Sequence, residues 1–230
     1  MNVHGKVSAA AIFGGVGDLG LRYARVWVVA AGFLATVMTG LDIALAGSGE
    51  SLANITGSIL SFFVSYHVVE TILRGESLLI SSSRSYGSLF GASILTSLGI
   101  GLAFLMLIVP GIYCMARWSL VTPLIVSEGR RTTEAMSESW NRTKDSVWSL
   151  AGVYAVYALG IVGLIFVAAM AGEIGGLPDE AVAGTGRVGV IMPFVVNLAS
   201  VAIGLIGNLI AIAIYRVLTG SGAQYEDVFG

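Results

Sequence analysis

Residues 87–128 read GSLFGASILTSLGIGLAFLMLIVPGIYCMARWSLVTPLIVSE and carry only one basic residue, Arg117, before the terminal Glu128. One straight helix over this stretch would be about 60 Å long, twice the hydrocarbon thickness of a bilayer. Proline and glycine together end a helix and turn the chain, so Pro110-Gly111 predicts a tight hairpin between two membrane spans. The alternative is a single kinked helix over 87–128.

The rest of the chain has the composition of a membrane protein. Charged residues make up 11% and hydrophobic residues 56% of the 230 positions, whereas soluble domains carry about 25% charged residues. A membrane helix needs about 20 apolar residues. The apolar runs therefore predict an all-α polytopic bundle of six transmembrane helices within a domain at 25–220, followed by a cytoplasmic tail at 221–230. The expected spans are about 25–47, 53–73, 87–109, 111–128, 147–171 and 189–216.

The N-terminal residues 1–24 are expected to form a cytoplasmic interfacial segment. Residues 7–24 have loosely helical apolar spacing, although their glycines weaken a helix. Ala44-Leu45-Ala46 resembles a signal-peptidase site, which leaves cleavage after the first apolar run as an alternative. That run is long for a signal peptide and its basic residues begin late, so an uncleaved signal-anchor helix is favoured.

The distribution of lysine and arginine predicts the orientation. Ten basic residues fall in the segments that are cytoplasmic if the N-terminus is inside, and only Arg187 falls in an outer loop. Because basic residues near span ends stay on the cytoplasmic side, both termini are expected in the cytoplasm. The ten are Lys6, Arg22, Arg25, Arg74, Arg84, Arg130, Arg131, Arg142, Lys144 and Arg216.

A second interfacial helix is predicted at 132–145. Thr132 or Thr133 can cap its start. Glu138 and Arg142 are spaced to pair on its polar side, while Trp140 suits an interface anchor. We interpret it as a connector helix, with a handle for lipid or a partner as the alternative.

The region 110–148 resembles one known family on a dozen residues. It is similar to the membrane domain of glycerophosphoryl diester phosphodiesterases and to free-standing small bacterial multi-pass membrane proteins. The resemblance implies a six-helix membrane bundle without catalysis of its own, since hydrolysis in the phosphodiesterases belongs to a separate soluble domain. It implies a location in a bacterial plasma (inner) membrane, and it implies no cofactor. The residues are Pro110, Gly111, Ile112, Tyr113, Arg117, Pro123, Glu128, Ala135, Ser139, Trp140, Lys144 and Trp148.

Arg117 is the principal candidate for an intramembrane polar site. An arginine within the bilayer costs at least about 2.5–3.5 kcal/mol unless it finds a partner. Counting 1.5 Å per residue from the span ends, Asp42 lies nearer to it in depth than Glu70 does. We therefore predict an Arg117–Asp42 ion pair, with recognition of an anionic group such as a lipid phosphate as the alternative.

Other polar residues in the spans are weaker candidates. His67 and Glu70 share a helix face, a spacing that suits a metal pair or a proton relay, but no second membrane histidine completes a site. Glu70 is also placed to meet Arg74. Asn197 and Asn208 lie on one face of the last span, where amides hydrogen-bond across helices or line a narrow polar cavity.

No catalytic signature is present in the sequence: there is no HExxH, Walker A or GxSxG motif. No cationic tract indicates nucleic acid, and no metal or cofactor is expected. The expected partners are membrane lipids and a membrane-protein partner or a second copy. The sequence thus predicts a non-enzymatic scaffold or interaction subunit of an inner-membrane assembly, with a transporter or lipid-handling protein built around Arg117 as the alternative.

Overall fold

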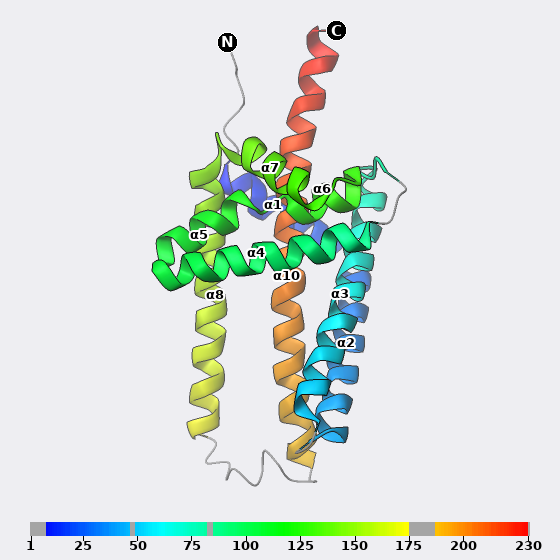
Figure 1. The fold of residues 1–230 in the computed structure, drawn as a ribbon, viewed down its shortest axis with the longest axis vertical. Coiled ribbons are helices and arrows are strands. Elements are labelled where there is room, and N and C mark those ends of the chain that lie inside the picture. Colours follow the sequence, from blue (N-terminus) through cyan, green and yellow to red (C-terminus); the bar gives the residue numbers. More distant parts are fainter. Residues whose placement is uncertain (1–7, 47–48, 82–84, 175–186, 230) are drawn as a thin grey trace. The chain divides into compact units, whose positions relative to one another are not determined.

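The computed structural model describes residues 8–46, 49–81, 85–174 and 187–229, and in these ranges every regular element is an α-helix (Figure 1). The all-helical prediction is confirmed for these residues. The helices are α1 (Ala9–Arg22), α2 (Ala24–Ala44), α3 (Glu50–Gly75), α4 (Tyr86–Met106), α5 (Ile108–Arg117), α6 (Val121–Glu128), α7 (Thr132–Thr143), α8 (Val147–Ile174) and α10 (Arg187–Phe229).

In the described part of the chain, six helical stretches are long and apolar enough to cross a membrane. Each begins and ends within a few residues of a predicted span, except that the fifth stretch ends at Phe166. The agreement follows from composition, because an apolar run of about 20 residues needs a helix to satisfy its backbone in lipid. The stretches are Ala24–Ala44, Ser51–Gly75, Tyr86–Met106, Ile108–Glu128, Val147–Phe166 and Val190–Thr219.

The chain divides into two compact units that share three helices. Unit 1 contains α1, the end of α3, all of α4 to α7, the start of α8 and the end of α10. Unit 2 contains α2 and the remaining parts of the three shared helices. The exact ranges are Met1–Tyr23, Val69–Tyr157 and Asn208–Gly230 for unit 1, and Ala24–Val68 and Ala158–Gly207 for unit 2.

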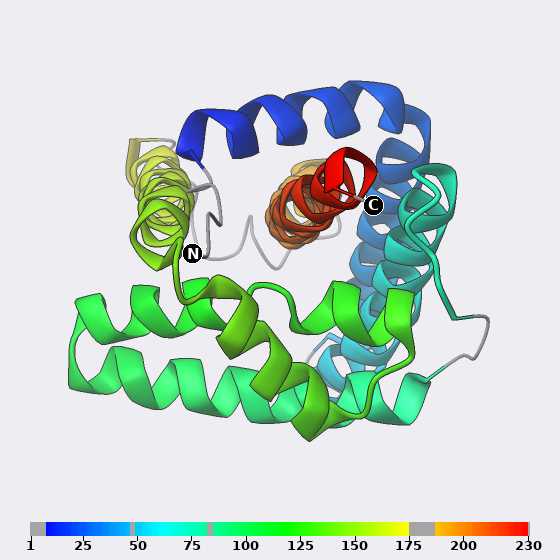
Figure 2. The same ribbon diagram turned by 90° about the horizontal axis from the view of Figure 1, so that it is seen from above.

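The predicted hairpin exists, but its turn lies three residues earlier than Pro110-Gly111. Leu107 is extended, with φ −167° and ψ 155°, and α5 begins at Ile108. Pro110 is the third residue of α5, in the first turn, where a missing N–H breaks no helical hydrogen bond. Gly111 allows close packing in the hairpin, because a Cβ there would lie 2.5 Å from the ring of Phe104. Figures 1 and 2 both show α4 and α5 side by side.

The predicted span 111–128 is not one helix. It is divided into α5 and α6 by an irregular turn at residues 118–120. Pro123 is again the third residue of its helix, so its missing N–H is accommodated as at Pro110. Gly129 ends α6 in the left-handed conformation, with φ 67°, which favours glycine.

The predicted helix at 132–145 is confirmed as α7, but neither threonine caps it. Arg131 occupies the N-cap position, and its backbone N–H donates to the Glu134 carboxylate at 3.3 Å. The Thr132 hydroxyl instead donates to the Ser88 carbonyl of α4 at 2.7 Å. The Thr132 side chain, which the local sequence predicted to cap α7, therefore makes a contact between α7 and α4 instead.

Residues 9–22 of the predicted N-terminal segment form a helix, α1, whereas residues 1–7 lie outside the described residues. Ser8 caps α1 by accepting from the Ala11 N–H at 3.2 Å. Ile12 and Leu19 are fully buried, so packing of this face offsets the weak helix propensity of the glycines.

Candidate functional site

The irregular turn between α5 and α6 is held by one serine from α7. The Ser139 hydroxyl donates to the Arg117 carbonyl at 2.7 Å and accepts from the Leu120 N–H at 3.2 Å. Ser139 is completely buried. Because a buried backbone group without a partner is costly, this hydroxyl allows the helix to break inside the protein.

Arg117 lies directly beside that turn, beneath aromatic rings. Its Cζ is 4.2 Å from the centroid of the Trp140 ring and 5.8 Å from that of Tyr113. Its Nη1 donates to the Thr143 hydroxyl at 3.5 Å. The residue is only 6% exposed. A cation over an aromatic face is stabilised by the ring quadrupole, so Trp140 supplies much of the electrostatic compensation for this buried charge.

The compensation of Arg117 is incomplete. In the described ranges its Nε is buried and has no hydrogen-bond partner, and no carboxylate forms an ion pair with it. A buried cation without a counter-charge is unusual in proteins. Arg117 is therefore the position at which an additional anionic group would gain most.

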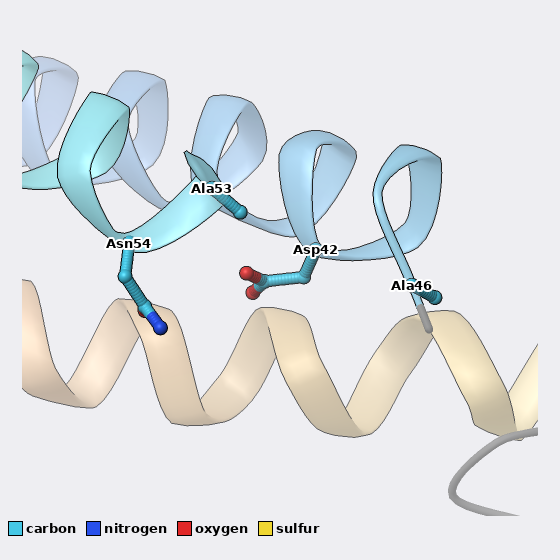
Figure 3. A pocket seen from close by; sticks show the side chains of 4 residues that line it. All are labelled: Asp42, Ala46, Ala53 and Asn54. Atoms are coloured by element: carbon cyan, nitrogen blue, oxygen red, sulfur yellow. The ribbon is translucent and has the colours of Figure 1, made fainter. Parts of the chain in front are cut away.

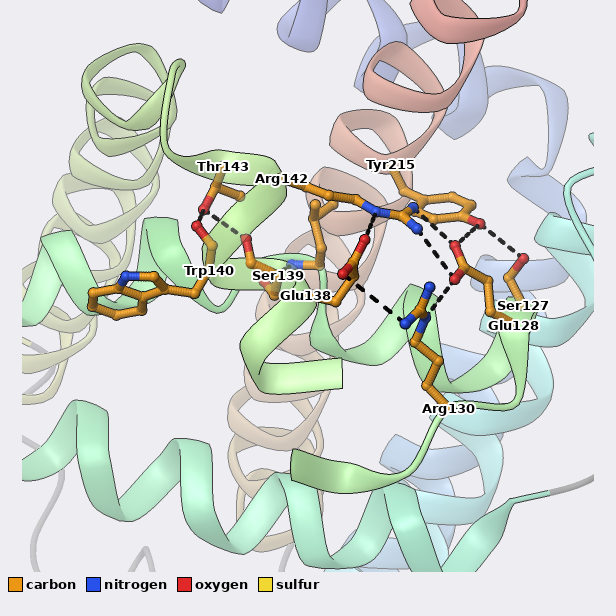
Figure 4. Close-up of polar contacts among 10 residues, drawn as sticks. Ser127, Glu128, Arg130, Glu138, Ser139, Trp140, Arg142, Thr143 and Tyr215 are labelled. Atoms are coloured by element: carbon orange, nitrogen blue, oxygen red, sulfur yellow. Dashed lines mark hydrogen bonds and ion pairs between the residues drawn. The ribbon is translucent and has the colours of Figure 1, made fainter. Parts of the chain in front are cut away.

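A second polar cluster surrounds the last residue of α6 (Figure 4). The Glu128 carboxylate accepts from Arg130 Nε at 2.6 Å and from Arg142 Nη1 at 2.8 Å. Arg142 also donates to Glu138 at 2.6 Å, which confirms the predicted pair on α7. The opposite charges balance, so this cluster, which we call the Glu128 network, joins α6 to α7 without excess charge.

The Glu128 network extends to α10 through Tyr215. The Tyr215 hydroxyl donates to Glu128 at 3.0 Å, and Ser127 Oγ lies 3.1 Å from it. Ser127 Oγ also donates to the Leu78 carbonyl. Tyr215 is 1% exposed, so its hydroxyl is a buried polar group with its hydrogen bonds satisfied.

A third cluster, which we call the Glu76 network, docks α1. Glu76 accepts from Arg22 at 3.0 Å, from Tyr23 at 3.1 Å and from Arg216 at 2.9 Å. Arg216 also donates to Asp18 at 2.9 Å. Successive residues of α10, Tyr215 and Arg216, thus belong to two different networks.

The networks shift the pKa values of their members outside the candidate spans. The hydrogen bond from Arg216 lowers the pKa of Asp18, against a smaller opposing effect of burial. Burial, helped by the nearby Glu76 carboxylate, raises the pKa of Tyr23. Burial alone would lower the pKa of Arg142, but its bonds to Glu138 and Glu128 raise it overall. Each shift favours the state that keeps its network intact.

Asp42 has polar partners within unit 2. Its carboxylate accepts from Asn197 Nδ2 at 2.8 Å, and the same amide donates to Thr39 at 3.2 Å. Asp42 and Asn54 line a pocket of about 290 Å³, also bounded by two alanines (Figure 3). Arg117 belongs to unit 1 and has its own contacts there, so the predicted Arg117–Asp42 ion pair stays a prediction.

The remaining candidates are distributed along two helices. Glu70 is buried and accepts from Arg74 at 2.7 Å, as the sequence indicated. His67 is exposed on the same helix. Asn197 and Asn208 share α10 but fall in different units, with Asn208 half-buried. Within the described ranges, no group of His, Cys, Asp and Glu side chains is arranged to hold a metal ion.

Sequence reasoning missed two residues that organise these clusters, Tyr215 and Glu76. A tyrosine followed by an arginine at the end of an apolar span was the available signal for Tyr215. Glu76 follows a glycine whose Cβ, if present, would lie 2.2 Å from the Tyr23 hydroxyl. That close approach is visible only in three dimensions.

Long apolar helices that are linked by small buried polar clusters define a multi-pass helical membrane protein. The chain belongs to the family of the membrane domain of glycerophosphoryl diester phosphodiesterase, whose family model matches residues 88–224. The match includes Arg117, Ser139 and the Glu128 network, and it confirms the resemblance seen in the sequence. Comparison with curated proteins and with solved structures gives no match.

Proposed function

We propose that this chain is a non-catalytic integral membrane protein that acts as a scaffold or interaction subunit in a bacterial inner membrane. Both termini and α7 lie on the cytoplasmic side in this proposal. The family membership and the long apolar helices support a membrane location. Ten basic residues against one in the expected outer loops support the orientation.

The observation that carries the proposal is the way the polar residues of the family motif contact one another. Ser139 bonds the backbone of the α5–α6 turn, Trp140 covers Arg117, and Glu128 meets two arginines and a tyrosine. Apart from Arg130, which lies in the loop between α6 and α7, these contacts join different helices or join α7 to the α5–α6 turn. Side chains used in this way build a rigid module rather than a centre of turnover.

A scaffold also needs a surface that a partner can reach. Trp148, at the start of α8, is 77% exposed, and Trp140 is 38% exposed. Tryptophan is enriched both at membrane interfaces and at protein interfaces, where it contributes more than most residues. These two indoles mark the surface on which we expect a membrane-protein partner or a second copy.

The test is native mass spectrometry of the tagged full chain, extracted with its surrounding lipid in polymer nanodiscs. We expect a homo-oligomer or a stoichiometric membrane partner. Trp148→Ala should weaken the assembly, whereas Leu159→Ala, a change at a similarly exposed residue further along α8, should not. A chain that is always a lone monomer would overturn the scaffold proposal.

A lipid-handling role is the second candidate, because the buried Nε of Arg117 has no hydrogen-bond partner among the residues that the structure describes. An anionic group such as a lipid phosphate would supply the missing counter-charge. We expect wild type to retain anionic lipid in the mass spectrum and Arg117→Leu to lose it, with Arg117→Lys intermediate. Equal lipid retention by wild type and Arg117→Leu would exclude this candidate while leaving the scaffold role standing.

A further inference from the structure

The charged side chains of α7 set a limit on how deep the neighbouring helices can lie. Glu134, Glu138 and Arg142 recur every four residues along α7. The side chains of Glu138 and Arg142 are 29% and 30% exposed. Partly exposed charges need water or lipid headgroups around them, because an acyl-chain environment gives them no solvation. These charges favour a position of α7 at the membrane surface along its whole length.

α7 lies along the α4–α5 hairpin rather than at its base. At its start, Thr132 bonds Ser88 near the beginning of α4. Toward its end, Trp140 packs against Tyr113 and Trp118 with ring centroids 6.0 and 6.3 Å apart. Trp118 in turn packs on Gly99, where a Cβ would lie 2.5 Å from the indole.

These contacts are incompatible with a hairpin that stands upright in the bilayer. Ser88 and Gly99 are separated by eleven residues, or about 16 Å along α4. If α4 crossed the membrane, the Trp140 end of α7 would be drawn about that far into a hydrocarbon core some 30 Å thick. Arg142 and Glu138 lie within one turn of Trp140 and would enter the core with it.

The tip of the α4–α5 hairpin is also too apolar for a loop that emerges into water. Five consecutive apolar residues form it, with side chains between 68% and 83% exposed. A turn emerging into water on the far side would leave all of them in contact with water. The residues are Leu105, Met106, Leu107, Ile108 and Val109.

We propose that α4, α5 and α6 do not cross the membrane but lie along its cytoplasmic surface, with the exposed apolar face of α4 embedded in the acyl chains of the inner leaflet. The proposal rests on the membrane location and α7 orientation proposed above. Within unit 1, Figures 1 and 2 show α4 and α5 running across the direction of the first turns of α8 and the last turns of α10. Helices in this position bury one apolar face. The face consists of Phe90, Ile94, Leu98, Leu102 and Leu105, which are all exposed.

This arrangement explains the one basic residue that the span pattern left inside the bilayer. A hairpin on the surface leaves the following loops on the same side as one that crosses twice, so the orientation of α8 and α10 is unchanged. Arg117 then lies at the depth of the cytoplasmic headgroups, together with α7. Eleven of the twelve basic residues fall on the cytoplasmic side, as the positive-inside rule favours.

The test is a depth profile by spin-label accessibility to oxygen and to a water-soluble nickel complex, on the full chain in lipid nanodiscs. Single cysteines replace Phe90, Ile94, Leu98, Leu102 or Leu105 in a Cys114→Ser background. We expect a nearly constant, shallow depth along α4. An upright α4 would instead give a profile that is deepest near Leu98, since these labels span about 22 Å of helix. That result would overturn the proposal.

The matched control is α8, which has exposed positions at Val156, Leu159, Val162 and Phe166. There the label depth should change steadily over about 15 Å. A flat profile on both helices would contradict the membrane-spanning protein itself, so the failure of that proposal is distinguishable from failure of this one. As a second measurement, an impermeant maleimide applied outside intact cells should label Ala46→Cys but not Leu107→Cys. Labelling of Leu107→Cys would also overturn the surface hairpin.

Discussion

The two units place carboxylates among very different partners. In unit 1, Glu128 accepts from two arginines and a tyrosine, and Glu76 accepts from two arginines and a tyrosine. In unit 2, Asp42 accepts a hydrogen bond from the neutral amide of Asn197. In unit 1 the negative charge of each carboxylate is neutralised by arginine side chains. In unit 2 the negative charge of Asp42 is stabilised by the dipole of a neutral amide.

The difference indicates which region holds the fold together and which is adaptable. A carboxylate that bonds several cations from different elements fixes the positions of those elements relative to one another. Removing the carboxylate leaves each cation without its counter-charge. A carboxylate with an amide partner beside a pocket loses less on neutralisation, because asparagine keeps an oxygen acceptor at that position. Stability should therefore respond strongly to changes in unit 1 and weakly to equivalent changes in unit 2.

Glu128→Gln, in unit 1, is the substitution from which we expect the largest loss of stability. It leaves Arg130 and Arg142 with a neutral partner, and we expect a loss of about 2–3 kcal/mol of unfolding free energy, below the usual 3–5 kcal/mol for buried pairs because the arginines are partly exposed. The measurement is reversible unfolding in mixed micelles followed by circular dichroism. Asp145→Asn, an exposed change nearby, is the control and should alter stability by less than about 0.5 kcal/mol.

Ser139→Ala should cause the next largest loss of unfolding free energy. The change leaves the Arg117 carbonyl and the Leu120 N–H buried without this hydroxyl, at a cost of about 1–3 kcal/mol. The same unfolding measurement applies. Ser58→Ala in unit 2 removes only a bond to the carbonyl one turn back on its own helix, at 2.8 Å, and should be nearly neutral. Equal losses for the two serines would refute the contrast.

Asp42→Asn should have a small effect, below about 1 kcal/mol, because the new amide still offers an oxygen to Asn197. Asp42→Leu removes that acceptor and should cost more. If Asp42→Asn proved as damaging as Glu128→Gln, the carboxylate charge would be needed in unit 2, and the predicted pairing with Arg117 would gain support.

The smallest expected effect is a pH dependence in the Glu76 network. The pKa of Asp18 is lowered from 3.8 in the folded protein. Its contribution to stability is therefore fully present above pH 3.8 and is lost as the pH falls through the lower folded-state pKa. The difference in melting temperature between wild type and Asp18→Asn should shrink as the pH is lowered toward about 2. A difference independent of pH would show that Asp18 acts without its charge.

The sequence predicted the helices well and their breaks poorly, for separate physical reasons. Long apolar runs determine where a helix must form in lipid, so α2, α3 and α4 lie within a few residues of expectation. The turn at Leu107 has no local signal, since its neighbours are all apolar. Pro110 misled because its usual helix-breaking effect disappears in a first turn.

The partners of the polar residues could not be read from local spacing. Arg117 contacts Trp140 and Thr143 of another helix. The depth of Arg117 along its predicted span could rank only the acidic residues as partners, so it could not indicate an aromatic ring or a hydroxyl. Glu128 and Tyr215 are 87 residues apart. The pair Glu138–Arg142 was predictable because both residues lie on one helix, a single turn apart.

The adjacent positions of Tyr215 and Arg216 have a consequence for biosynthesis. Both networks in unit 1 are completed by residues of α10, so neither can close until the ribosome has made Tyr215 and Arg216. At about 5–20 residues per second, Glu76 is synthesised many seconds before Arg216 reaches it. During that interval the nascent chain carries Glu76 and Glu128 carboxylates that have only part of their final partners. The order of synthesis thus leaves both networks open until α10 is made.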